Sequence, residues 1–570
     1  MIKKCAAWIS LGLLSLFLAV PLPAAAASKP NLVLITLDSV RADRMGFLGA
    51  KGSLTPNLNL LAAQSIVFDH AYAQAPSSVV SHATILTGSY PQSIGVSEIG
   101  GTLAPTLPYL PDLLKAQGYR TAAFVGSIDL DPRNGLAQGF DRAFDVYDAD
   151  FRPVIPGDPR PPATERTGAQ VVSRAMTWLG RNAQEPFFLW VHISDANARA
   201  SYNAAITAAD SAVGKLLAAL GAQKLAACTA IIVVADHGQS LGAHGESTHG
   251  IFLYDETIHV PLLVKQPDAQ PTAIRVTAKV RLVDIAPTVL EIAGIPVPSQ
   301  MHGQSLLRIA KSGGNADQPV YSRSDLSQRG FGWSPLESWR AGKYLYIRAP
   351  KPELYDTTAD PGATRNVAQS SKGTLDTIAA QLDSFDSRLS AGADKSSSNL
   401  SSSEIQKLAS LGYVGLQKSS AAAAAVTGID PKDKIALANK VVDVAPSGIA
   451  PTNPDRAIAA ALASVDSADS NPYLAEYTLG VALAEKARYA EAVKHLHKAV
   501  ELQPESAWAH YEIGATLLET GDLKTAVVHL EIAAARLPAF AAAHAALANG
   551  YDHLGRRDDA KRELVKAGQK

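Results

Sequence analysis

The strongest constraint on the fold is a 34-residue repeat near the C-terminus. Small residues, tyrosines and prolines recur at that spacing: Gly480 and Gly514, Tyr477 and Tyr511, Pro504 and Pro538, and Ala492, Ala526 and Ala560. Small residues let two helices approach closely, and a proline cannot continue a helix. Each unit is therefore predicted to be a pair of packed helices. Stacked helix pairs form a solenoid whose concave surface binds other molecules.

The period and the pattern resemble tetratricopeptide repeats. Two full units cover residues 471–537, a third runs to the end of the chain, and a degenerate unit is expected from about Asp430. We assign 430–570 to an all-α tetratricopeptide solenoid and expect it to recruit a protein partner.

Residues 31–347 show a different pattern, in which short apolar runs alternate with helical stretches such as Tyr202–Leu220. The apolar runs are Leu32–Leu37, Thr121–Val125, Phe187–His192 and Ala230–Ala235. Runs of this length are typical of strands covered on both faces. The alternation predicts an α/β domain around a mainly parallel sheet, with the active site at the carboxyl ends of its strands.

The remaining boundaries follow from composition. We assign 28–317 to the α/β domain and 318–394 to a small α+β subdomain, with a strand at Lys343–Ile347 and a turn-rich stretch at Pro352–Asp356. Residues 395–429 are a low-complexity linker, because Ser396–Ser403 is nearly all Ser and Asn and Ala421–Ala425 is an alanine run. The chain has 52 Lys plus Arg and 53 Asp plus Glu, a balance that argues against nucleic acid as a partner.

Residues 1–27 have the features of a secretory signal peptide. Lys3 and Lys4 precede an apolar stretch, and small residues end at Ala27. We expect a periplasmic or secreted bacterial protein with no membrane span after cleavage; the alternative is an uncleaved N-terminal anchor. Cleavage removes Cys5 and leaves Cys228, so no internal disulfide forms.

Three side chains that end predicted strands favour a metal site. Asp38 follows the first apolar run, and Asp236 and His237 follow the run that ends at Ala235. A buried carboxylate needs a cation or hydrogen-bond donors, and Asp with His supplies oxygen and nitrogen ligands. Taken singly, Asp38 is also a helix-cap candidate and Asp236-His237-Gly238 a turn.

Ser78 is the candidate nucleophile. It lies in Ala75–Gly88, which reads as a loop entering a helix. The N-terminus of a helix favours anions, and an adjacent metal favours the alkoxide. The segment by itself favours the alternative, a serine that only caps the helix.

These segments together resemble the sulfatase family of the alkaline phosphatase superfamily. The similarity runs in order from Asn31 to about Gly415, through Asn31–Asp43, Thr55–Leu58, the Ser78 segment, Asp236–Gly238, Leu253–Pro261, Val283–Ile295, Glu353–Asp356 and Asp360-Pro361. The resemblance implies an alkaline phosphatase/sulfatase-like sheet flanked by helices. It implies a divalent metal (Ca, Mn, Mg or Zn) held by Asp38, Ser78, Asp236 and His237, with Ser78 at the nucleophile position.

Formylglycine is not expected at Ser78. In the family that modification requires a proline two places on and an arginine four places on, and the chain has Val80 and His82 there. The resemblance therefore implies a plain hydroxyl nucleophile. The second metal-binding aspartate of true sulfatases is replaced by Ser39.

Histidines complete the predicted catalytic set, which comprises Ser78, His82, His192 and His249. His192 ends a predicted strand, and His249 occupies a region where relatives place a group that contacts the ester anion or a second metal. Both are also explained as hydrogen-bonded structural residues. Related repeat-bearing proteins have a histidine where this chain has Asn197, the loop that follows is largely missing, and the Lys-x-His pair of true sulfatases is absent.

Two functions follow from these features. The first is an exported, metal-dependent hydrolase of small-molecule sulfate or phosphate esters, with a Ser78 nucleophile. The second is a catalytically impaired sulfatase-like domain that acts as a binding or scaffold protein through its repeats.

Overall fold

The structure is a computed structural model. It describes residues 29–52, 54–97, 100–134, 137–151, 165–195, 201–268, 273–312, 318–392, 428–442 and 473–568, together with positions 455, 458, 459 and 462. The predicted signal peptide, most of the predicted linker and the Asn197 position lie outside the described residues.

An eight-stranded sheet forms the centre of the molecule, in the order β10-β2-β9-β8-β1-β7-β5-β6. Its strands are β1 (Asn31–Leu37), β2 (Ile66–Tyr72), β5 (Arg120–Phe124), β6 (Val146–Asp148), β7 (Phe187–Ile193), β8 (Thr229–Ala235), β9 (His259–Lys265) and β10 (Ile274–Arg281). Only β9 runs antiparallel to its neighbours. The four predicted apolar runs are β1, β5, β7 and β8, and β1, β7 and β8 are buried along their whole lengths, as strands covered on both faces should be.

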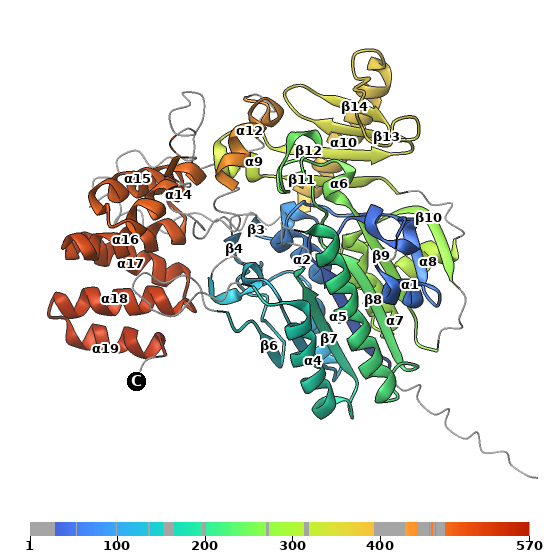
Figure 1. Cartoon of the computed structure of the whole chain (residues 1–570), viewed down its shortest axis with the longest axis horizontal. Helices are drawn as coiled ribbons and strands as arrows, with labels where there is room; N and C mark the ends of the chain where they lie inside the picture. The colour runs from blue at the N-terminus through green and yellow to red at the C-terminus, as the bar shows by residue number, and fades with distance from the viewer. Residues whose placement is uncertain are drawn as a thin grey trace, which may run out of the picture.

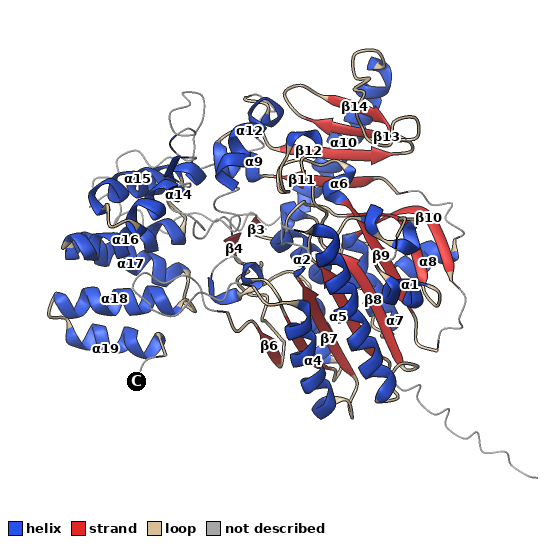
Figure 2. Cartoon of the chain, in the orientation of Figure 1, coloured by secondary structure: helices blue, strands red, loops and turns tan. Residues whose placement is uncertain are grey.

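Helices pack against this sheet in two groups (Figures 1 and 2). One group contains α1 (Pro56–Ala62), α4 (Gly168–Asn182) and α5 (Tyr202–Ala222), and the other contains α2 (Ser78–Thr87), α3 (Leu110–Ala116) and α7 (Ile285–Ile292). In the described chain, α5 alone is long and apolar enough to cross a membrane. It is a core helix, because its buried Asp210 accepts hydrogen bonds from the backbone of Asn57 and Leu58 at the start of α1.

A second, four-stranded antiparallel sheet follows, made of β11 (Val320–Ser324), β12 (Leu336–Ala341), β13 (Tyr344–Arg348) and β14 (Glu353–Asp356). Helix α10 (Lys372–Gly392) packs on it around an aromatic cluster that includes Tyr321, Trp339 and Phe385. The predicted strand at Lys343–Ile347 is β13. The turn expected at Pro352–Asp356 is wrong, because Glu353–Asp356 pairs with β13 as an edge strand.

The C-terminal part is a stack of helices: α14 (Tyr473–Glu485), α15 (Tyr489–Leu502), α16 (Ala507–Thr520), α17 (Leu523–Arg536), α18 (Ala541–His553) and α19 (Arg557–Lys566). Pro504 and Pro538 follow the ends of α15 and α17, as the repeat predicts. A Cβ on Gly480 would lie 2.5 Å from the Leu496 Cγ, and one on Gly514 would lie 2.7 Å from the Leu530 Cγ. The recurring glycines therefore let paired helices touch.

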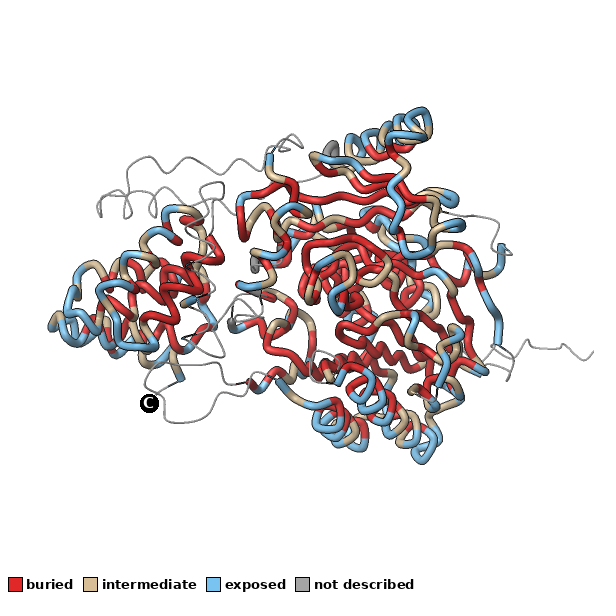
Figure 3. The backbone as a smooth tube through the Cα atoms, turned by 45° about the horizontal axis from the view of Figure 1, so that its top comes forward, coloured by how far each residue is buried: buried red, intermediate tan, exposed pale blue. Residues whose placement is uncertain are grey.

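The solenoid contacts the sulfatase-like part through specific elements. Helix α9 (Leu326–Phe331) packs on α14, and helix α12 (Pro431–Val442) precedes the solenoid. Gln138 Nε2 donates to the Arg536 carbonyl at 2.6 Å, and the Gln503 side-chain amide donates to the Arg329 carbonyl. Buried residues are concentrated in the two sheets and inside the solenoid (Figure 3).

Candidate active site

The carboxyl ends of adjacent parallel strands bring the predicted metal ligands together. β1 lies between β7 and β8, so Asp38 at the end of β1 is next to Asp236 and His237 at the end of β8. The backbone continues the ladder past the strands, since Asp236 N donates to the Leu37 carbonyl at 3.2 Å. Asp38, Asp236 and His237 are each at most 1% exposed.

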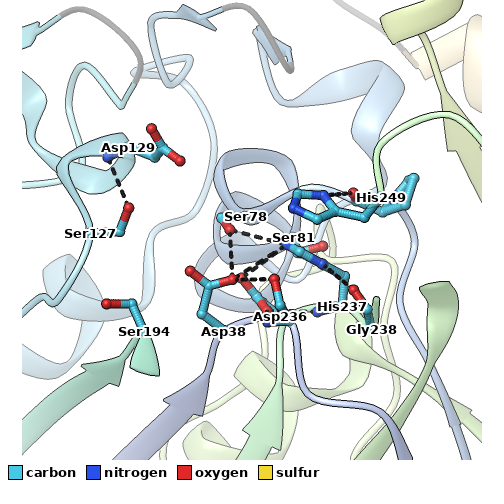
Figure 4. A network of polar contacts seen from close by, with 12 residues as sticks. Asp38, Ser78, Ser81, Ser127, Asp129, Ser194, Asp236, His237, Gly238 and His249 are labelled. Carbon is cyan, nitrogen blue, oxygen red and sulfur yellow. Dashed lines mark hydrogen bonds and ion pairs between the residues drawn. The ribbon is translucent and has the colours of Figure 1, made fainter. Parts of the chain in front are cut away.

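Ser78 completes the group as the first residue of α2, with Ser77 as the N-cap. Its Oγ lies 3.1 Å from His237 Nε2 and 3.5 Å from Asp38 Oδ1. Figure 4 shows these four side chains pointing toward one another at the head of the helix. The structure therefore brings the four predicted metal-site residues together, from segments up to 199 residues apart.

The tautomer of His237 follows from its second contact. His237 Nδ1 lies 2.8 Å from the Gly238 carbonyl, which can only accept, so Nδ1 carries the proton. The Nε2 lone pair therefore faces Ser78 and the two carboxylates. A histidine that ligates a metal commonly uses this arrangement, because the backbone contact fixes the ring.

Ser39, predicted to replace the second metal-binding aspartate of true sulfatases, contacts both carboxylates of the group. Its Oγ donates to Asp38 Oδ1 at 2.8 Å, and its backbone N–H donates to Asp236 Oδ1 at 3.1 Å. Its φ of 59° is in the left-handed region, which is uncommon for a residue with a side chain. Ser39 thus orients both carboxylates without adding a third negative charge.

The electrostatics of the group favour a cation. Burial, and then the charge of Asp236, raises the pKa of Asp38 from 3.8 to about 7. Burial likewise raises the pKa of Asp236 to about 7. Asp236 Oδ2 is buried without a hydrogen-bond partner. Asp38, Asp236 and His237 offer ligand atoms within 4.8 Å of one another, so these residues fit a divalent metal.

The three other predicted histidines lie at different depths. His82 is fully buried one turn along α2. Its Nδ1 lies 2.7 Å from the Ser78 carbonyl and its Nε2 lies 3.0 Å from Thr36 Oγ1. Burial lowers its pKa to about 3. These contacts link the first residue of α2 to Thr36 of β1. The predicted catalytic role of His82 stays a prediction.

His192 is the one histidine of β7 and is also fully buried. Its Nδ1 accepts from Gly126 N at 3.3 Å, and its Nε2 has no hydrogen-bond partner but lies 3.9 Å from Asp38 Oδ2. Together with His82 and Asp236 it forms a second group with metal-ligating geometry. Burial holds the pKa of His192 well below its usual range.

His249 is partly exposed and contacts the segment just before Ser78, the predicted nucleophile. Its Nδ1 lies 3.1 Å from the carbonyl of Pro76, two residues before Ser78, so Nδ1 carries the proton. Its ring centroid is 4.2 Å from that of His237. His82 and His192 are fully buried, whereas His249 both contacts the site and is accessible to solvent.

One side of the site is acidic, and its residues are not among those predicted from the sequence. Asp129, half-buried after β5, and Glu165, exposed before α4, both contact Ser127, and Glu165 also accepts from Ser194 at 2.9 Å. Burial, and then the charge of Asp38, raises the pKa of Asp129 to about 7. The position of Asp129 in the sequence could have indicated this side of the site. Asp129 follows β5, and β5 pairs with β7, the neighbour of β1.

Comparison with known proteins places this geometry in a family. The Sulfatase family model matches residues 30–295, and the model for the C-terminal part of N-sulphoglucosamine sulphohydrolase matches residues 244–387. Together the two models span residues 30–387, and this part of the chain belongs to the sulfatase family. A TPR repeat model matches residues 480–521, so this sulfatase-family protein also carries tetratricopeptide repeats.

Curated relatives of this sulfatase-family chain carry sulfatase names. An ulvan-active sulfatase of Formosa agariphila is 27% identical over 62% of the chain and 80% of the relative. An N-acetylgalactosamine-6-sulfatase of Canis lupus familiaris is 28% identical over 53% of the chain and 70% of the relative. The family is therefore one of sulfuric ester hydrolases.

Solved structures show the same fold. A phosphonate monoester hydrolase of Agrobacterium radiobacter aligns with a TM-score of 0.54 at 18% identity, over 63% of this chain and 96% of that one. The 2-O GAG sulfatase BT1596 aligns with a TM-score of 0.53 at 21% identity, over 65% and 96%. The α/β fold with a sulfatase-like sheet, predicted from the sequence, is confirmed.

Proposed function

We propose that this protein is an exported, metal-dependent hydrolase of small-molecule sulfate esters that uses the Ser78 hydroxyl as its nucleophile. The observation that carries the proposal is the position of Ser78 Oγ, at the N-terminus of α2 and within 3.5 Å of both His237 Nε2 and Asp38 Oδ1. The sulfatase family of the chain supports the substrate class.

Asp38, Asp236 and His237 would hold a divalent cation, and Ser78 would complete its ligands. When bound, the cation supplies positive charge that favours the serine alkoxide and offsets the charge of the ester. Two carboxylates with one imidazole suit Mn or Zn as well as Ca or Mg. Ser39 keeps both carboxylates oriented through its two hydrogen bonds.

The remaining steps use residues of the chain. The first turn of α2 points its backbone N–H groups at the reacting anion. Ser78 Oγ loses its proton to solvent and attacks the sulfur in line, while the bond from sulfur to the leaving oxygen breaks. His249 is the proposed proton donor to that oxygen, since it is the partly exposed histidine beside Ser78. Water then cleaves the serine ester, which releases sulfate and restores the Ser78 hydroxyl. The signal-like residues 1–27 support export, and the repeats support recruitment of a protein partner.

The second candidate function is a non-catalytic binding protein. One observation favours it: the carboxyl groups of Asp129 and Glu165 lie close enough to Asp38 to interact with its charge, and once ionised they add negative charge on that side of the site. Without a cation, these groups repel a sulfate ester.

The decisive experiment measures metal content and turnover together. The purified mature protein is assayed on an aryl sulfate, a phosphate monoester and a phosphodiester. We expect turnover of the aryl sulfate, and a loss on the order of 10³-fold or more in Ser78→Ala with metal still bound. Ser81→Ala is the matched control, because the Ser81 hydroxyl donates to the Ala75 carbonyl instead and this variant should retain activity.

Other outcomes are informative. Full activity in Ser78→Ala removes the serine from the mechanism. Turnover of only the phosphate esters moves the proposal to phosphoric ester hydrolysis, and silence on all three substrates without bound metal favours the binding protein. A loss of two hydrogens from the peptide that contains Ser78 would show that formylglycine is formed after all.

A further inference from the structure

The loop that carries His249 starts at the metal-ligating pair and is sharply turned. It runs from Gly238 to Tyr254, and Leu241, Gly242, His244, Gly245 and Gly250 all have positive φ. Gly242 N donates to the Glu246 carbonyl at 2.8 Å, and Ser240 N donates to the Thr248 carbonyl at 2.6 Å. These short-range bonds shape the loop, but they do not fix it to the rest of the molecule.

Ser324 Oγ donates to the Gly250 carbonyl, and Asn439 of α12 attaches the tip of the loop from a distant part of the chain. Its Nδ2 donates to the Gly245 carbonyl at 2.7 Å, and its Oδ1 accepts from Ser247 N at 2.9 Å and from Ser247 Oγ at 3.1 Å. An asparagine amide can donate and accept at once, as a neighbouring strand would. Ile435, one turn earlier on α12, packs on Gly245.

The helix that carries Asn439 is itself fixed to the second sheet. Asp430 Oδ2 accepts from Lys351 N at 2.9 Å, and Lys432 Nζ lies 2.6 Å from Glu353 Oε1. Glu353 also accepts from the Tyr254 hydroxyl at 2.6 Å, at the far end of the same loop. The segment after the linker therefore holds the tip of the loop, and it also binds Glu353 of the second sheet, which holds the end of the loop.

The part of the loop that Asn439 binds lies next to the predicted catalytic residues. Ser247 is two residues from His249, and His249 contacts both the His237 ring and the Pro76 carbonyl before Ser78. A shift of residues 245–247 would move His249 relative to the nucleophile. Losses of geometry of about 1 Å cost enzymes up to about a hundredfold in rate.

We propose that Asn439, on the helix that leads into the repeats, is a positioning residue of the active site, which holds the 245–249 loop so that His249 faces Ser78. The inference rests on the proposed function of His249. It means that the catalytic unit does not end at the linker: residues 428–442 belong to it structurally, and the solenoid is attached through a helix that touches the active-site loop.

The test compares Asn439→Leu with the neighbouring control Lys440→Met in the full chain with metal bound. Leu keeps the size of the side chain but removes its donor and acceptor, and Lys440 is exposed on the same helix. For Asn439→Leu we expect kcat on an aryl sulfate to fall between about tenfold and a hundredfold. KM, metal content and the melting temperature should stay close to those of Lys440→Met.

Wild-type kcat in Asn439→Leu would overturn the proposal, and so would a fall in kcat that is matched by loss of metal or of melting temperature. A second readout does not depend on turnover: the rate at which diethyl pyrocarbonate modifies His249, followed by mass spectrometry. We expect that rate to rise several-fold in Asn439→Leu and not in Lys440→Met. If the wild type proves inactive on all esters, the function of the site fails, and an unchanged modification rate would separately refute the positioning role.

Discussion

Asp236 has one carboxylate oxygen that is satisfied and one that is not. Oδ1 accepts from Ser39 N and from His237 N, at 3.1 and 2.7 Å. Oδ2 is buried without a hydrogen-bond partner, 3.6 Å from His237 Nε2 and 3.7 Å from His82 Nδ1. An unsatisfied buried acceptor costs about 1–3 kcal/mol, and a bound cation would remove that cost.

Asp236→Asn tests this residue directly. The variant keeps the shape and removes the negative charge, so divalent metal should no longer raise its melting temperature. Without metal at pH 8, the variant should melt no lower than the wild type, because it no longer buries a charge. Differential scanning fluorimetry with EDTA and with added Mn²⁺ measures both effects, and the exposed Asp141→Asn is the control. A metal-induced shift as large as that of the wild type would contradict the assignment.

Glu512 in the solenoid gives a pH-dependent prediction away from the site. It is 8% exposed on α16, and burial, followed by the charge of Glu485, raises its pKa to about 8. A carboxyl whose folded pKa is raised stabilises the fold fully below its unfolded pKa and loses that contribution as the pH rises through 8. Glu512→Gln should therefore stabilise the protein at pH 9, by on the order of 2–4 kcal/mol at most, and change little at pH 5. The midpoints of urea unfolding at both pH values measure this change in stability, and the exposed Glu519→Gln is the control. Equal shifts of the midpoint at both pH values would contradict the prediction.

At the scale of elements, some features were predictable because local sequence sets them. The runs at Leu32–Leu37 and Ala230–Ala235 are strands because apolar residues on both faces suit the middle of a parallel sheet. Glu353–Asp356 was not recognised, because its strand character comes from pairing with β13. Asn439 could not be found from sequence, because its role depends on a contact with a loop about 190 residues away. The convergence of Asp38, Ser78, Asp236 and His237 was expected from strand ends and from family resemblance, and Asp129 was missed.

The paired repeat helices lie so close together that adding a side chain between them should lower the free energy of unfolding. Gly514→Ala places a Cβ 2.7 Å from the Leu530 Cγ and 3.2 Å from the Ala526 carbonyl oxygen. We expect a loss of about 1–3 kcal/mol from overpacking. Gly180→Ala is the matched control, since a Cβ there meets nothing within 4 Å in α4 and should be neutral or stabilise by up to about 1 kcal/mol. Urea unfolding of both variants measures the difference, and equal midpoints would contradict close packing at Gly514.

For the molecule as a whole, the metal site links the ends of two central strands to the first turn of α2, so cation binding should stabilise the entire α/β unit. Asp38 and Asp236 each have a folded pKa raised from 3.8 to about 7. Without metal, their contribution to stability is complete below about pH 4 and is lost as the pH rises through 7. A cation must displace the protons that they hold, so it binds weakly in acid and strongly above pH 7.

The expected result is a metal effect that grows with pH. At a metal concentration of 100 times the dissociation constant, binding contributes about 2.7 kcal/mol. A rise in melting temperature of several degrees should therefore appear at pH 8 and nearly vanish at pH 5. Thermal melts with and without EDTA across that range measure it, and Asp236→Asn, which lacks a ligand, should flatten the curve. An equal metal effect at both pH values would place the cation elsewhere in the molecule, because a cation held by these two carboxylates must compete with their protons in this window.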